Sequence, residues 1–240
     1  MTEKKTKTKE KKFIKVDDVD QKEPKKVTRT TKAERREKAT GKRVAAVIFW
    51  LLGIACEIVA ILLLCRKLYV TDDKLLMWVL IAFAADLVFI IIGSQFWKRA
   101  NDVDPASEEN KVKFWLWNQM GLIVACLAFL PVIIVLLLNK QLDGKTKKIA
   151  TAAAVVGLLV AGLVSFDYDP ISAEEREAAE TTFEGEAIYW TQWGKKYHLY
   201  EDCQAFHGSE NIFVGTIESA MDAGRTSLCA FCEKRLHDGN

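Results

Sequence analysis

The sequence predicts a mainly α-helical membrane protein, in which a four-helix transmembrane bundle is followed by a small α+β C-terminal domain. Four apolar runs are each long enough to cross a bilayer, and Cys and His residues gather near the C-terminus. The charge also changes along the chain, because residues 1–43 carry +9, residues 44–166 carry +2 and residues 167–240 carry −9. The formal net charge of +2 hides these differences, and a single soluble globular domain is excluded.

Residues 1–43 are expected to form a disordered basic tail. They hold 17 Lys and Arg residues against 8 Asp and Glu residues, and they contain few large apolar side chains. Such a segment cannot bury enough apolar surface to offset the entropy that the chain loses on folding. Two roles stay open for this tail: an electrostatic tether to anionic lipid, or a solvated segment that only sets membrane orientation.

Residues 44–166 contain the four predicted transmembrane helices. A hydrocarbon layer of about 30 Å is crossed by about 20 helical residues. The predicted spans are 44–65, 75–97, 114–138 and 149–166. The fourth span is the shortest and is rich in Ala and Gly, and without it the C-terminal domain would change sides of the membrane.

The distribution of basic residues predicts that the N-terminus is cytoplasmic. In that orientation, the cytoplasmic segments near the helix ends carry fourteen Lys and Arg residues, and the outer loops carry seven. Cytoplasmic loops of membrane proteins have such an excess. Four crossings then return the C-terminal domain to the cytoplasm, so we expect a multi-pass protein of the cell membrane with both of these segments inside.

Small residues recur every four positions in the fourth apolar run, at Ala153, Gly157, Ala161 and Ser165. On a helix they share one face, which allows a neighbouring backbone to approach closely. Packing within the chain and a homodimer interface are both open readings of this pattern.

Two acidic residues, Glu57 and Asp86, lie inside the first two apolar runs. Counted from the expected cytoplasmic ends, both would lie roughly 16–20 Å deep, near the middle of the bilayer. A carboxylate there is costly, so these side chains should face protein or water. They form either a cation or proton site, or a protonated pair that hydrogen-bonds to polar groups such as Asn118, Gln119 or Ser94.

The C-terminal segment is expected to begin with an acidic linker over residues 167–186, which includes a short helix capped by Ser172. Residues 187–240 are expected to form an α+β module. Its predicted elements, in chain order, are a hairpin over 187–200, a strand over 211–215 and a helix that begins at Thr216 and ends at Gly224.

The module concentrates side chains that bind soft metals. All three His residues and three of the six Cys residues lie in the last 43 residues, whereas the other Cys residues belong to the apolar runs. Cys229 and Cys232 have the two-residue spacing that lets both thiolates reach one tetrahedral ion. His198 and Cys203 provide the other half of the site, so we predict one structural Zn²⁺ with these four ligands.

The choice of the fourth ligand leaves alternatives. His198 ends a predicted hairpin strand beside Cys203, which places it on a fixed element. His207 is the main rival, because it stands four residues after Cys203 and could share a helix face with it. His237, five residues after Cys232, is the weakest candidate.

The same residues resemble a known family. The stretch YW…GKKYHLYEDCQAF…IFVGTIESAMDAGRTSLCAFC is similar to the small zinc-binding module related to the metal-binding domain of the Ada DNA-repair protein, which recurs in bacteria on membrane and secreted proteins. The resemblance covers residues 188–235 and implies the same four ligands. Ada itself uses four cysteines, whereas His198 comes first here, and Leu228 replaces a common Pro. Methyl acceptance is therefore not carried over, and the apolar runs resemble no family.

Three functions follow as expectations. The first is a membrane protein that displays a zinc-stabilised interaction or sensing module, with the lipid bilayer and either a protein partner or a second copy as partners. The second is a small transporter that uses Glu57 and Asp86, and the third is a redox or metal sensor that uses the zinc thiolates. We do not expect an enzyme, because four protein ligands close the coordination sphere. The charge of −9 over residues 167–240 disfavours nucleic acid.

Overall fold

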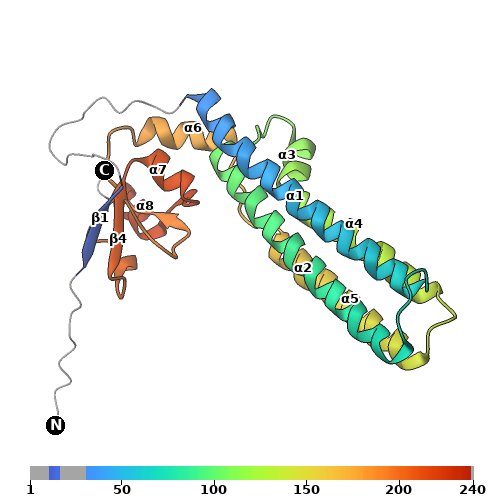
Figure 1. The fold of residues 1–240 in the computed structure, drawn as a ribbon. Coiled ribbons are helices and arrows are strands. Elements are labelled where there is room, and N and C mark those ends of the chain that lie inside the picture. The colour runs from blue at the N-terminus through green and yellow to red at the C-terminus, as the bar shows by residue number, and fades with distance from the viewer. Residues whose placement is uncertain (1–10, 17–30, 239–240) are drawn as a thin grey trace, which may run out of the picture. The chain divides into compact units, whose positions relative to one another are not determined.

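The computed structural model describes residues 11–16 and 31–238 (Figure 1). They form two compact units. The helical unit runs from Arg36 to Pro170, and the C-terminal unit combines the described residues from Ile171 onward with those before Arg36. The rest of the predicted basic tail, residues 1–10 and 17–30, lies outside the described residues.

The helical unit contains four helices that are long and apolar enough to cross a membrane: α1 (Lys32–Leu64), α2 (Asp72–Val103), α4 (Met120–Leu138) and α5 (Gly144–Ser165). Large apolar side chains are exposed along all four, as hydrocarbon solvent allows, and they include Leu51, Val88, Leu127 and Leu159. The mainly α fold with four candidate spans therefore agrees with the prediction.

Helix α1 begins at Lys32, twelve residues before the predicted start of the first span at Val44. A capping box explains this start. The hydroxyl of Thr31 accepts a hydrogen bond from the Glu34 backbone N–H at 3.3 Å, and the Glu34 carboxylate accepts one from the Thr31 N–H at 2.7 Å. The end of the predicted tail is thus helical.

The third apolar run also differs from its prediction, because it is divided into α3 (Lys111–Asn118) and α4. Gln119 separates the two helices. Its side chain donates to the Asp167 carbonyl at 2.8 Å and accepts from the Asp167 backbone N–H at 3.1 Å, so it ties this break to the end of α5. Hydropathy reports the free energy of transfer into lipid, so it does not detect a break between two apolar helices.

Small residues allow the helices of this unit to pack closely. A Cβ atom on Gly93 of α2 would lie 2.5 Å from Cδ1 of Trp50 in α1, and one on Gly157 of α5 would lie 2.8 Å from the Phe129 ring in α4. Ser165 donates a hydrogen bond to Ser94 at 2.9 Å. The small-residue stripe of α5 is therefore used within the chain.

The C-terminal unit has two small sheets. One has the strand order β1-β4-β2 and the other pairs β3 with β5 in parallel. The strands are β1 (Lys12–Lys15), β2 (Ile188–Thr191), β3 (Lys196–Tyr197), β4 (Asn211–Gly215) and β5 (Ser227–Leu228). The helices are α6 (Ala173–Thr182), the 3-10 helix η1 (Gln204–Phe206), α7 (Ile217–Asp222) and α8 (Ala230–Asp238).

Helix α6 belongs to this unit and is not the free spacer that we expected for residues 167–186. Ser172 caps it as predicted, with a full capping box to Glu175. Its Arg176 is almost completely buried and bonds to Glu180 at 2.7 Å and to Asp222 of α7 at 2.9 Å. These ion pairs join α6 to the module, so the unit begins earlier than residue 187.

Strand β1 departs from the disordered tail that we expected. Lys12–Lys15 pair in parallel with Asn211–Val214 of β4, so the two strands lie side by side (Figure 1). This pairing escaped prediction because KFIK has too few apolar residues to show a strand pattern, and its partner lies near the other end of the chain.

Candidate metal centre

Four elements of the C-terminal unit each bring one metal-binding side chain to the same place. His198 follows β3, Cys203 precedes η1, Cys229 follows β5, and Cys232 lies in the first turn of α8. The ligand atoms of these four residues all lie within 4.8 Å of one another, and all four residues are buried. The structure thus brings together the four residues that the sequence predicted.

The distances in this group fit a tetrahedral ion. An ion at about 2.3 Å from each sulfur and about 2.0 Å from nitrogen needs sulfurs about 3.8 Å apart and a sulfur–nitrogen separation of about 3.6 Å. The sulfurs of Cys203 and Cys229 are 4.0 Å apart. Nδ1 of His198 lies 3.3 Å from the Cys203 sulfur and 3.9 Å from the Cys232 sulfur. The group could therefore hold a metal ion.

Short backbone pairings fix these positions. Tyr189 of β2 and His198 exchange two backbone hydrogen bonds, of 2.9 and 2.8 Å. The Cys229 N–H donates to the Tyr197 carbonyl at 2.9 Å, which continues the β3–β5 pairing. His198 and Cys229 are thus held in register by neighbouring residues of two paired strands, so these pairings join the two halves of the site.

The rest of the ligand set is placed by α8 and by the loop that follows His198. Cys229 directly precedes α8 and Cys232 lies in its first turn, so the start of this helix positions both sulfurs. Arg235 of α8 lies over the Tyr200 ring at 4.2 Å and bonds to Asp202 at 2.7 Å. These contacts join the loop between His198 and Cys203 to the helix that carries Cys232.

Burial controls the charge of the ligands. It lowers the pKa of the His198 imidazole to about 4 and raises the pKa of the Cys203 thiol to about 12. The imidazole is therefore neutral near pH 7, as a ligand must be. A bound cation would reverse the preference of the thiol, because it stabilises the thiolate directly.

The two rival histidines lie outside the group. His207 follows η1 and His237 lies in the last turn of α8, and both are exposed. The i, i+4 spacing of Cys203 and His207 does not place them on one helix face, because η1 is a single 3-10 turn.

Phe206 is a supporting residue that the sequence analysis missed. It is completely buried, and its ring centroid lies 4.3 Å from that of His198. An aromatic residue three positions after a ligand Cys was the only sequence signal. Its burial fixes the plane of the imidazole and keeps water from that side of the centre.

No protein-family model, curated protein or solved structure matches this chain. The similarity to the Ada-like module therefore stays a prediction that rests on the residues quoted above.

The predicted acid pair lies within the helical unit. Glu57 of α1 is 5% exposed and Asp86 of α2 is 1% exposed. Glu57 Oε1 and Asp86 Oδ1 have no hydrogen-bond partner among the residues that the structure describes. The polar groups that we expected as partners bond elsewhere: Ser94 to Ser165, Asn118 to Asn101, and Gln119 to Asp167.

The surroundings of the acid pair are otherwise apolar. A Cβ on Gly53, one turn before Glu57, would lie 2.9 Å from Asp86 Oδ1, so Gly53 leaves room for that carboxylate. The backbone N–H of Val132 reaches the Glu57 carboxylate. Val132 follows Pro131, which interrupts the hydrogen-bond ladder of α4. Pro131 is thus a sequence signal for the acid site that hydropathy alone does not reveal.

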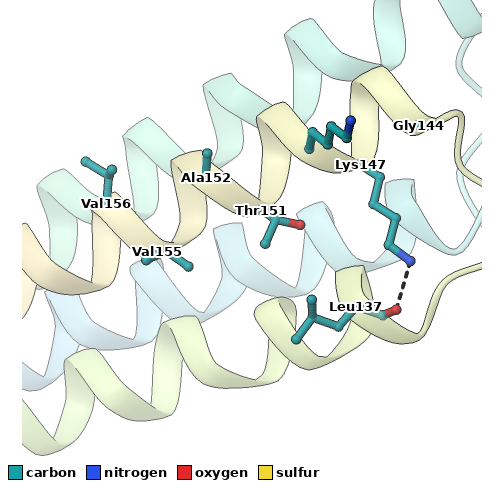
Figure 2. A pocket seen from close by; sticks show the side chains of 8 residues that line it. Leu137, Gly144, Lys147, Thr151, Ala152, Val155 and Val156 are labelled. Carbon is teal, nitrogen blue, oxygen red and sulfur yellow. Dashed lines mark hydrogen bonds between the residues drawn. The ribbon is translucent and has the colours of Figure 1, made fainter.

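Figure 2 shows an open groove between the end of α4 and the first half of α5. It is lined mostly by apolar side chains, including Leu137, Val155 and Val156. Lys147 donates to the Leu137 carbonyl at 2.8 Å and so completes the C-terminal end of α4 (Figure 2). The groove lies on two candidate membrane-spanning helices, where lipid acyl chains would fill an apolar groove. We therefore assign it no function.

Proposed function

We propose that this chain is a multi-pass membrane protein whose C-terminal unit is an interaction module stabilised by one structural zinc ion. The observation that carries the proposal is the buried convergence of His198, Cys203, Cys229 and Cys232. Three thiolates and one imidazole are a common ligand set of structural zinc, and the separations of 3.3, 3.9 and 4.0 Å fit its tetrahedral geometry.

Zinc in such a site would be structural because four protein ligands leave no open position. Catalytic zinc keeps one position for water or substrate. A unit of this size has a small core, and metal binding adds folding free energy that the core alone does not supply. We therefore propose no enzymatic activity for this centre.

The β1–β4 pairing supports a cytoplasmic location for the module. Strand β1 precedes the first candidate span and β4 follows the last, yet the two lie in one sheet. They must then occupy the same side of the membrane, which requires an even number of crossings and fits four spans. The excess of basic residues near the N-terminus favours the cytoplasm for that side.

The surface of the module favours a protein partner or a second copy of the chain. Residues 167–240 carry −9, which repels nucleic acid. Trp193 is 89% exposed and Phe231 is 57% exposed, and exposed aromatic residues are frequent anchors in protein interfaces. The resemblance to a module that recurs on membrane proteins supports the same role.

Metal analysis of the purified chain in detergent tests this proposal. We expect one zinc per chain, and we expect a strong chelator to abolish the near-ultraviolet circular dichroism of the module aromatics while the helical signal of the spans persists. The Cys232→Ser variant should lose the zinc, and Cys126→Ser, in a span, should keep it. A zinc-free chain with unchanged near-ultraviolet signal would refute the proposal.

A second candidate function is a proton or monovalent cation site at Glu57 and Asp86. Their unpartnered carboxylate oxygens favour it, because a buried polar atom without a partner is costly and indicates that a ligand completes the site. The two carboxylates interact electrostatically, and no Lys or Arg occurs in any of the predicted spans. A proton or a cation would supply the missing positive charge.

Flux measurements in proteoliposomes test this second candidate. With an imposed proton or sodium gradient, the wild-type chain should carry a flux that Glu57→Gln and Asp86→Asn each abolish. Glu109→Gln, which removes an exposed acid of the loop before α3, is the matched control and should leave the flux unchanged. A flux that persists in both carboxamide variants would eliminate this function.

A further inference from the structure

The outer edge of β4 is closed by a strand from the other end of the chain. β4 is the central strand of its sheet, antiparallel to β2 and parallel to β1. If β1 leaves, β4 presents a row of unpaired N–H and C=O groups along one edge. Such an edge is a template for any extended chain that can complete the ladder.

Backbone hydrogen bonds provide the specific contacts of β1. The Lys12 N–H donates to the Glu210 carbonyl at 2.7 Å, and the Val16 N–H donates to the Val214 carbonyl at 2.8 Å. Donors in a ladder alternate in direction, so the N–H of Ile14 also faces β4. The N–H groups of the two residues that flank Ile14 face away.

The side chains of β1 add little burial. None of residues 11–16 is buried, and Phe13 is 44% exposed. The Phe13 ring meets the Tyr189 ring edge to face, with centroids 6.2 Å apart. Backbone bonds that replace bonds to water give a small net stability, so a strand held mainly by them can exchange.

The charge of β1 suits the unit that it joins. Lys11, Lys12 and Lys15 surround the apolar pair Phe13 and Ile14, whereas residues 167–240 carry −9. The Lys11 ammonium lies 6.0 Å from the centre of the Phe206 ring. The edge therefore accepts a basic–apolar–apolar–basic segment.

The residues that Phe13 of β1 and the preceding Lys11 approach adjoin the metal centre. Tyr189 shares two backbone hydrogen bonds with His198, and Phe206 packs against the same imidazole. The edge that receives β1 is thus shaped by the elements that the metal ligands hold together. Peptide docking should require the metal-bound fold.

We propose that the β4 edge is a docking site for an extended peptide of basic–apolar–apolar–basic sequence on a protein partner, and that residues 12–15 are a tethered strand which this peptide displaces. The proposal deepens the proposed interaction function and rests on it. The chain's own segment, seated on the edge in parallel, shows the chemistry that the partner must supply.

Peptide binding to the full zinc-loaded chain in lipid nanodiscs tests the proposal. The probe is a fluorescent peptide with the sequence of residues 11–16, KKFIKV, followed by anisotropy. The Ile14→Pro variant removes a donor that faces β4, so its edge should be open and should bind the probe at least tenfold more tightly than wild type. Lys15→Pro, where the lost N–H faces away, is the matched control and should behave as wild type.

Two N-methylated probes test the ladder itself. Methylation at the Ile14 nitrogen should abolish binding to the Ile14→Pro variant, and methylation at the Lys15 nitrogen should preserve it. Equal binding of both probes would overturn the proposal, as would equal affinity of wild type and Ile14→Pro for the unmodified probe.

Zinc content and oligomeric state, measured on the same samples, separate the remaining outcomes. A zinc-loaded, folded variant that binds no probe overturns the docking site but leaves the proposed zinc module standing. A chain that binds no zinc removes the proposed function and this inference with it. A wild-type dimer that Ile14→Pro converts to a monomer would show instead that β1 is exchanged between two copies.

Discussion

The ring of Phe206 lies against the imidazole of His198, with centroids 4.3 Å apart and planes inclined by 53°. Because Phe206 is completely buried, the imidazole cannot swing away from the three sulfurs without moving the core. The orientation of this ligand is thus a property of the packed unit, and it can be altered without replacing any ligand.

Phe206→Leu should weaken metal binding while all four ligands remain. Supporting residues around a metal ligand are worth about 10- to 100-fold in affinity, and Leu keeps most of the buried volume. Competition with a chromogenic zinc chelator measures the effect. Phe231→Leu, at an exposed position beside Cys232, is the control, and equal affinities of the two variants would show that Phe206 does not orient His198.

The three histidines should separate cleanly by their effect on zinc content. His198→Asn removes the only imidazole of the buried group, so it should release the ion or lower its affinity by orders of magnitude. His207→Asn and His237→Asn change exposed side chains and should retain one zinc per chain. Elemental analysis of the three purified variants decides the matter, and zinc loss in His207→Asn would contradict the assignment.

Gly93→Ala should destabilise the helical unit, because its Cβ would overlap Trp50 of α1. Overpacking of this kind costs about 1–3 kcal/mol. Gly41→Ala is the matched control, since a Cβ at Gly41 meets nothing within 4 Å and Ala favours the helix by about 0.5–1 kcal/mol. The free energy of unfolding of each variant can be measured by the loss of helix in increasing sodium dodecyl sulfate. A Gly93→Ala protein as stable as the control would show that Trp50 of α1 can move away from the added Cβ.

Arg176→Ala should destabilise the C-terminal unit by about 1–3 kcal/mol, because it removes the buried ion pairs to Glu180 and Asp222, while Glu180 keeps its ion pair with Arg35 at 2.6 Å. The thermal transition of the near-ultraviolet signal reports this loss. Arg235→Ala breaks an ion pair whose side chains are more than half exposed and screened by solvent, so it should shift the thermal transition much less than Arg176→Ala does. Similar losses for both variants would argue against the role of Arg176 in joining α6 to α7.

The metal group could be predicted because its information is local. The two-residue spacing of Cys229 and Cys232 is typical of two thiolates that bind one tetrahedral ion, and His198 and Cys203 lie close together in sequence. The four apolar runs were equally visible, since transfer into lipid depends on composition over about 20 residues. The capping residue Ser172 and the strand Asn211–Gly215 followed from short patterns as well.

The features that escaped prediction depend on distant contacts. β1 is held in the sheet by backbone hydrogen bonds to β4. Backbone hydrogen bonds do not depend on which exposed side chains the strand carries, so the sequence does not reveal them. The break at Gln119 depends on the main chain of Asp167, which is 48 residues away. Arg176 lies in the short helix that was predicted for the linker, but its burial could not be predicted, because only the fold brings Asp222 to it.

The positions of β1 and β4 in the chain also impose an order on biosynthesis. A ribosome makes Lys12–Lys15 before any candidate span, and it makes Asn211–Gly215 only after all four. In the part of the chain that the structure describes, the strand that pairs with the early segment is made only after the four candidate spans, and throughout that interval the segment is open to chaperones and to neighbouring nascent chains. Closure of the sheet therefore marks a polypeptide whose four candidate spans have all been synthesised.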